Sequence, residues 1–214
     1  MSDVTDKHPG ILLFGGTFDP IHNGHIQIAR LIAAKLTVHK VIFIPSAHPP
    51  HKEPHSLTPA PMRLALTQLA LEGDDLFEVS DCELHRRGPS FTLDTIRYFR
   101  DQFGPDTTLY WLIGADTISE LPGWYKVNQL VEQCTIVTAR RPGYQAQLSS
   151  ALFQNVLTPA QITRLQQHVI DTPEFDISAT DIRSRLRRGL TVNELIPPKV
   201  LQYITDNNLY KSHT

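Results

Sequence analysis

Apolar residues in this chain gather in short runs that alternate with stretches of helical spacing. The clearest runs cover residues 11–14, 41–44, 108–113 and 134–139, and a weaker one covers residues 76–79. Short apolar runs bounded by Gly, Pro or polar residues are typical of strands that are buried on both faces. Between the runs, apolar residues recur every three or four positions, which predicts amphipathic helices.

The helical spacing begins just after His25, where Ile26, Ala29, Ile32 and Leu36 share one face. Strand, helix and strand in succession form a βαβ unit, which implies parallel strands with right-handed crossovers. The sequence therefore predicts an α/β fold, a Rossmann-like open parallel sheet with helices on both faces, in a single domain of residues 10–214 behind a flexible leader of residues 1–9. The predicted helices cover about residues 25–36, 62–71, 91–103, 159–167, 178–190 and 197–207.

Helix ends and loops add local detail. Ser90 or Thr92 is expected to cap the third helix, and Ser178 with Asp181 has the S-x-x-D spacing of a capping box.

Residues 45–61 contain six prolines and three histidines, which predicts a long surface loop at a strand end. Apart from the helix at residues 159–167, the weakly patterned stretch that starts at residue 144 is expected to be the least ordered part of the fold.

Composition narrows the class of protein. A chain of 214 residues with 41% hydrophobic residues can bury a sizeable core. The net charge of -2 gives no basic field for a nucleic acid, and no apolar run approaches the ~20 residues that span a bilayer. The polar first ten residues lack a signal-peptide core, so a cytoplasmic protein is expected. Cys82 and Cys134 are predicted to be buried free thiols.

The first candidate site follows the first strand. Gly15 and Gly16 interrupt the apolar run, and His22 and His25 precede a helix. Glycine allows a close approach of the backbone to an anion, and the free N–H groups at a helix start favour phosphate. The alternatives are a plain turn with incidental histidines, or a metal site shared with the loop histidines, although their spacing matches no zinc pattern.

A second candidate anion site opens a helix near the C-terminus. Ser178 and Thr180 place hydroxyls at the helix start, and Arg183 lies about one turn further along. Hydroxyls, free amides and a guanidinium at one helix end suit a polyphosphate. Without a ligand, the same pattern describes an ordinary capped helix.

Two further strand ends carry polar or aromatic residues. Gly114 and Asp116 follow the strand at residues 108–113, where an acid can accept hydrogen bonds from a ribose or cap a helix. Trp124 and Tyr125 follow a Pro-Gly turn, where they could form a wall for a flat ring or belong to the core.

Two of these segments carry recognisable motifs. The eleven residues 15–25, G-G-T-F-D-P-I-H-N-G-H, and residues 177–183, I-S-A-T-D-I-R, resemble the two signatures of the HxGH nucleotidyltransferases. From about residue 11 to 210 the chain resembles the bacterial nicotinate-nucleotide adenylyltransferase family. The further matching motifs are P-P-H-K, P-S-F-T, I-G-A-D-T, P-G-W-Y and A-R-R-P-G-Y.

The resemblance implies transfer of the adenylyl group from ATP to nicotinate mononucleotide in NAD biosynthesis, with Mg²⁺ carried by the ATP phosphates. It implies that His22, His25 and Arg183 are catalytic. The implied ATP contacts are Gly15, Gly16, Thr17, Phe18, His22, His25, Gly114, Asp116, Ser178, Thr180 and Arg183. The implied mononucleotide contacts are Lys52, Thr92, Trp124, Tyr125 and Arg141.

Several alternatives stay open at this point. Ser46-Ala47 departs from the asparagine that related sequences often have, which weakens any inference about substrate contacts of that loop. The acceptor could be nicotinamide mononucleotide or phosphopantetheine, or the fold could bind nucleotides without turnover. Neither a nucleic acid nor a membrane is expected as a partner, and both a monomer and a homo-oligomer are possible.

Overall fold

The structure, a computed structural model, describes residues 10–50, 57–143, 148 and 151–211. The predicted leader at residues 1–9 lies outside the described residues, and so do Lys52 and part of the weakly patterned stretch. The predictions made for those residues remain predictions.

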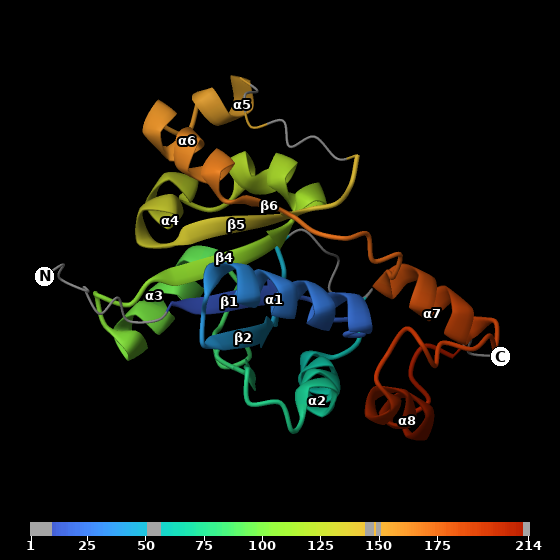
Figure 1. The fold of residues 1–214 in the computed structure, drawn as a ribbon. Coiled ribbons are helices and arrows are strands. Elements are labelled where there is room, and N and C mark those ends of the chain that lie inside the picture. The colour runs from blue at the N-terminus through green and yellow to red at the C-terminus, as the bar shows by residue number, and fades with distance from the viewer. Residues whose placement is uncertain (1–9, 51–56, 144–147, 149–150, 212–214) are drawn as a thin grey trace, which may run out of the picture.

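Six parallel strands form one sheet within the described residues (Figure 1). Their order is β3-β2-β1-β4-β5-β6, so the chain builds the sheet outward from β1 on one side and then from β4 on the other. This arrangement confirms the predicted α/β fold with an open parallel sheet. The strands are β1 (Ile11–Gly16), β2 (Lys40–Pro45), β3 (Phe77–Val79), β4 (Leu109–Gly114), β5 (Thr135–Arg140) and β6 (Val169–Asp171).

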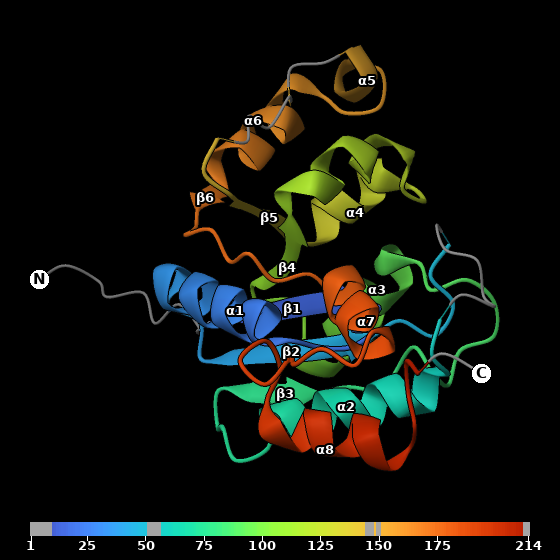
Figure 2. The same ribbon diagram turned by 90° about the vertical axis from the view of Figure 1, so that its right-hand side faces the viewer.

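Helices cover both faces of this sheet, as predicted. Leu12 and Leu13 are adjacent in β1 but belong to two different clusters of buried side chains, because successive residues of a strand point to opposite faces. Figure 2 shows α1 and α3 on either side of β1. The helices are α1 (Asn23–Leu36), α2 (Ala60–Leu71), α3 (Thr92–Phe103), α4 (Val127–Gln133), α5 (Ala151–Gln154), α6 (Pro159–Gln167), α7 (Ala179–Arg187) and α8 (Pro198–Asp206), with a 3₁₀ helix η2 (Ala115–Gly123).

Some predicted helix ends were wrong. Phe91, rather than Ser90 or Thr92, precedes α3, and no side chain caps this helix. The Ser90 side chain instead accepts a hydrogen bond from the His48 amide, 3.1 Å away, because the two loops lie together. The α7 capping box is only half formed. Ser178 accepts from the Asp181 amide, whereas the Asp181 carboxylate pairs with Arg185.

Other features agree with the composition. Cys82 and Cys134 are buried free thiols, and burial raises the pKa of Cys134 to about 12. In the described part of the chain, no helix has both the length and the apolar character needed to cross a membrane.

Candidate active site

A cavity of about 720 Å³ lies at the carboxyl ends of β1 and β4. The strand order reverses between these two strands, which is where open α/β sheets bind ligands. Thirteen of the predicted site residues line this one cavity. They are Gly15, Gly16, Thr17, Phe18, His22, His25, Thr92, Gly114, Asp116, Trp124, Tyr125, Arg141 and Ser178.

Three predicted residues are not in this lining. Thr180 and Arg183 lie in α7, whose N-cap Ser178 and first residue Ala179 line the cavity, and Lys52 is outside the described residues. Most of the residues predicted from the sequence therefore lie around one cavity, and the roles assigned to them remain predictions.

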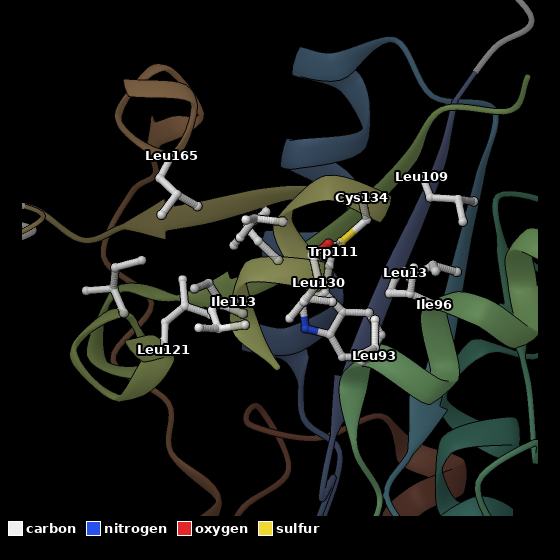
Figure 3. Close-up of a cluster of buried hydrophobic side chains, with 14 of the residues drawn as sticks. Leu13, Leu93, Ile96, Leu109, Trp111, Ile113, Leu121, Leu130, Cys134 and Leu165 are labelled. Atoms are coloured by element: carbon white, nitrogen blue, oxygen red, sulfur yellow. Dashed lines mark hydrogen bonds between the residues drawn. The ribbon is translucent and has the colours of Figure 1, made fainter. Parts of the chain in front are cut away.

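The two glycines that end β1 leave room for aromatic rings. A Cβ on Gly15 would lie 2.4 Å from the Trp111 ring, and one on Gly16 would lie 2.9 Å from the Phe18 ring. Figure 3 shows Trp111 among side chains of α3 and α4, including Leu93 and Leu130. The glycines are thus required for packing of the protein itself, a reason that the sequence did not indicate.

The two histidines form a stacked pair. Their ring centroids are 3.6 Å apart and the ring planes differ by 22°. The backbone N–H of His22 donates to Nδ1 of His25 over 3.3 Å. Because Nδ1 accepts, a neutral His25 carries its proton on Nε2 and can donate from there. The edges of Phe14 and Phe18 contact the same ring and hold its orientation.

His22 is held neutral. Its side chain is buried, and Nδ1 has no hydrogen-bond partner among the described residues. Burial, and after it the positive charge of Arg141, lower the pKa of His22 from 6.5 to about 4. A bound phosphate would oppose both effects, because it supplies negative charge and a hydrogen-bond acceptor.

The second motif lies beside the first. Arg183 donates from Nη1 to the backbone oxygen of Asp19 over 2.7 Å, and from Nη2 to Thr180 Oγ1 over 3.3 Å. Figures 1 and 2 both place α7 next to the start of α1. Two segments that are 164 positions apart therefore border one cavity.

The opposite end of the cavity is aromatic. The Tyr125 ring stacks on Phe91, with centroids 4.4 Å apart. Trp124 packs partly against the core, and its buried Nε1 lacks a hydrogen-bond partner in the described structure. The start of α3, at Phe91 and Thr92, faces the same space. Flat rings and a helix N-terminus together suit an aromatic ligand that carries an anionic group.

Asp116 lies at the end of β4. A Cβ on Gly114 would come within 2.5 Å of Asp116 Oδ1, so the glycine allows the carboxylate to fold back over the strand end. The residue before η2 is Gly114, and Asp116 does not cap this helix. Its exposed carboxylate borders the cavity, where it can accept hydrogen bonds from a ligand.

Several residues near the cavity were not predicted. The Asp19 carboxylate accepts a hydrogen bond from the Tyr210 hydroxyl over 2.6 Å, which ties the C-terminal segment to the first motif. Glu83 lines the cavity, accepts from Thr95, and has its pKa raised by burial. Arg63 is 1% exposed. The only available signal for Arg63 was its position on the inward face of α2, one turn before Leu66 and Thr67.

Among the described residues, no group of three or more His, Cys, Asp or Glu side chains is placed to hold a metal ion. The groups near the cavity that can bind an anion are the imidazole pair, Arg141, Arg183 and the helix starts. This cavity can therefore hold an anion at one end and an aromatic ring at the other.

Comparison with known proteins agrees with this arrangement. Residues 13–185 match the model of the cytidylyltransferase-like family. A relative from Moorella thermoacetica, named "Probable nicotinate-nucleotide adenylyltransferase", is 39% identical over 93% of this chain and 90% of its own length. A relative of the same name from Serratia proteamaculans is 37% identical over 98% of this chain and 97% of its own length.

Solved structures show the same fold. Nicotinic acid mononucleotide adenylyltransferase from Plasmodium falciparum, complexed with NaAD, superposes with a TM-score of 0.73. The alignment covers 95% of this chain and 98% of the other, at 20% identity. The complex of the same protein with APC gives a TM-score of 0.72.

Proposed function

Because the chain belongs to the nicotinate-nucleotide adenylyltransferase family, we propose that it transfers the adenylyl group of MgATP to nicotinate mononucleotide. The products are nicotinate adenine dinucleotide and pyrophosphate, and we infer that the reaction serves NAD biosynthesis in the cytoplasm. The observation that carries the proposal is the contact between Arg183 and the Asp19 backbone, which joins both signature segments at one cavity.

The reaction needs no nucleophile from the protein. The second pKa of a phosphate monoester is ~6, so the mononucleotide phosphate is mostly a dianion at neutral pH. One of its oxygens attacks the α-phosphorus of ATP in line, and the bond from that phosphorus to the pyrophosphate leaving group breaks. The barrier consists mainly of repulsion between anions and of their alignment, which positioning and positive charge reduce.

The first motif and α7 are proposed to hold the triphosphate. His25 can donate from Nε2, and His22 can donate once phosphate is near. Ser178, Thr180 and Arg183 are the proposed partners of the β- and γ-phosphates, and the backbone at residues 15–18 borders the nucleotide. Magnesium is expected to arrive bound to the ATP phosphates, where it neutralises part of their charge and keeps several waters.

Adenosine and nicotinate are proposed to occupy opposite walls. Gly114 and Asp116 would meet the adenosine ribose, since the Asp116 carboxylate borders the cavity. Trp124 would stack on the pyridine ring, with the amides of Thr92 and Tyr125 meeting its carboxylate. The first N–H groups of α3 lack partners within the helix and carry partial positive charge. This favours the acid over the amide as acceptor. Arg141 and Lys52 are proposed partners of phosphate.

Parallel assays with three acceptors test the function. Pyrophosphate release from MgATP is measured with nicotinate mononucleotide, nicotinamide mononucleotide and phosphopantetheine. We expect kcat/KM for the acid to exceed that for the amide by about 100-fold. The N–H groups proposed to bind the carboxylate of the acid would be poorly matched to the amide group. Faster release with either other acceptor would reassign the substrate. ATP binding without release for any acceptor would support a nucleotide-binding protein that lacks turnover.

A further inference from the structure

Helix α2 carries a buried cation that no signature motif contains. The guanidinium of Arg63 donates to three backbone oxygens: from Nε to Thr58 over 2.8 Å, from Nη1 to Thr17 over 2.6 Å, and from Nη2 to Ser46 over 2.6 Å. The side chain is 1% exposed. Its planar fork thus meets three fixed acceptors at once, which an ammonium group cannot do with the same geometry.

The acceptors belong to two loops: Thr17 lies in the loop after β1, whereas Ser46 and Thr58 lie at the two ends of the loop between β2 and α2. Thr17 follows β1 and borders the proposed nucleotide site, whereas Ser46 follows β2 and begins the loop that reaches Pro49 and Pro50. The Ser46 amide donates to the Gly16 carbonyl over 2.8 Å, which is the last backbone hydrogen bond between the two strand ends. Beyond this point, Arg63 joins the two loops.

Burying a guanidinium carries a desolvation cost that an apolar side chain of similar size does not have. Removing such a charge from water costs several kcal/mol, which its hydrogen bonds and nearby charges must offset. The carboxylates of Asp19 and Glu83 both act favourably on the charge of Arg63. An apolar side chain would pack in α2 without that cost, so the geometry that Arg63 imposes on the loops is its distinctive contribution.

We propose that Arg63 is a positioning residue that sets the separation between the Thr17 loop and the Ser46 loop, and thereby aligns the two reacting phosphates. The inference rests on the proposed function, because it concerns the relative placement of two substrates. Each substrate can still bind through its own proposed contacts when Arg63 is altered. The two reacting phosphates should be less well aligned, and a displacement of ~1 Å between reacting groups can lower a rate by about 10²-fold.

The main test uses Arg63→Lys, which keeps the positive charge but removes the planar guanidinium group. We expect kcat for adenylyl transfer to fall by about 10- to 100-fold. The Kd for ATP alone and the Kd for nicotinate mononucleotide alone, both measured by calorimetry, should stay within about threefold of wild type, because the substitution removes none of the proposed contacts of either ligand.

Thr67→Val is the matched control. Thr67 is buried one turn after Arg63, and its hydroxyl donates to the Arg63 backbone oxygen over 2.8 Å. The substitution perturbs the same helix without touching the guanidinium or either loop. We expect a lower melting temperature and a wild-type kcat.

Two kinetic results would overturn the inference. One is a kcat for Arg63→Lys within twofold of wild type. The other is a fall in kcat accompanied by a rise of similar size in both substrate Kd values, since this would indicate damage to the individual sites.

If Arg63→Lys does not fold, Arg63→Met, which removes the buried charge, is measured in the same way. Failure of both variants to fold would make Arg63 a folding residue and also overturn the inference. No turnover by the wild-type protein would instead remove the proposed function, and the inference with it.

Discussion

The imidazole rings of His22 and His25 lie face to face, 3.6 Å apart between centroids, at the start of α1. At this distance two imidazolium ions would repel each other strongly, so an empty site favours at least one neutral ring. Burial and the positive charge of Arg141 lower the pKa of His22 to about 4, which favours the neutral form of this ring at neutral pH. A triphosphate would change this balance, which makes the pair a sensitive reporter of ligand binding.

The low pKa of His22 predicts that acid destabilises the fold. In the unfolded chain His22 takes up a proton near pH 6.5, whereas in the folded protein it does so only near pH 4. Between these values the unfolded state binds more protons, so the free energy of unfolding falls as the pH decreases. The loss attributable to His22 is at most about 3 kcal/mol. Urea unfolding at a series of pH values measures it. His22→Asn should flatten the slope in this window, and an unchanged slope would contradict the assignment.

Removal of either imidazole should slow the chemical step. If His22 and His25 donate to phosphate oxygens as charge develops, His22→Ala and His25→Ala should each lower kcat by about 10²-fold or more, by analogy with the loss of an oxyanion donor. Pyrophosphate release measures the effect. His85→Ala provides the control, since His85 is exposed and its side chain pairs with Asp81 on the surface. Near-normal turnover by His22→Ala would remove its catalytic role.

Trp124 should affect binding of the mononucleotide more than the rate. Loss of a ring stack in Trp124→Ala should raise KM for nicotinate mononucleotide by about fivefold, which corresponds to roughly 1 kcal/mol. KM for ATP should change little. Trp124→Phe keeps a flat ring and should recover most of the affinity. If KM for the mononucleotide does not move in Trp124→Ala, the indole belongs only to the core that it partly contacts.

Gly15 should be intolerant of a side chain for reasons internal to the protein. A Cβ there would lie 2.4 Å from the Trp111 ring, which is buried among Leu93, Leu130 and their neighbours (Figure 3). Gly15→Ala should therefore lower the free energy of unfolding by about 1–3 kcal/mol, as overpacking does. Gly123→Ala, which meets no atom within 4 Å, should have little effect. Equal stability of the two variants in urea would show that Trp111 can move aside.

Local pattern was sufficient for most of the fold. The apolar runs located β1, β2, β3, β4 and β5 to within one or two residues, and helical spacing located α1, α2, α3, α6, α7 and α8. The elements that it missed are short or weakly patterned. Helix α4 is only seven residues long, and β6 is a three-residue edge strand whose identity depends on pairing with β5. Pairing with a neighbouring strand stabilises such a short strand, whose own residues show too weak a strand pattern to predict it.

The sequence by itself determined the strand and helix alternation and the two signature segments, because those follow from local spacing and residue chemistry. Only the tertiary structure decided which groups meet. Tyr210 reaches Asp19 across 191 positions, Trp111 lies over Gly15, and Arg63 joins Thr17 to Ser46. Such contacts depend on how whole elements pack. The periodicity of the sequence does not predict which distant backbone oxygen will accept a hydrogen bond from a buried side chain.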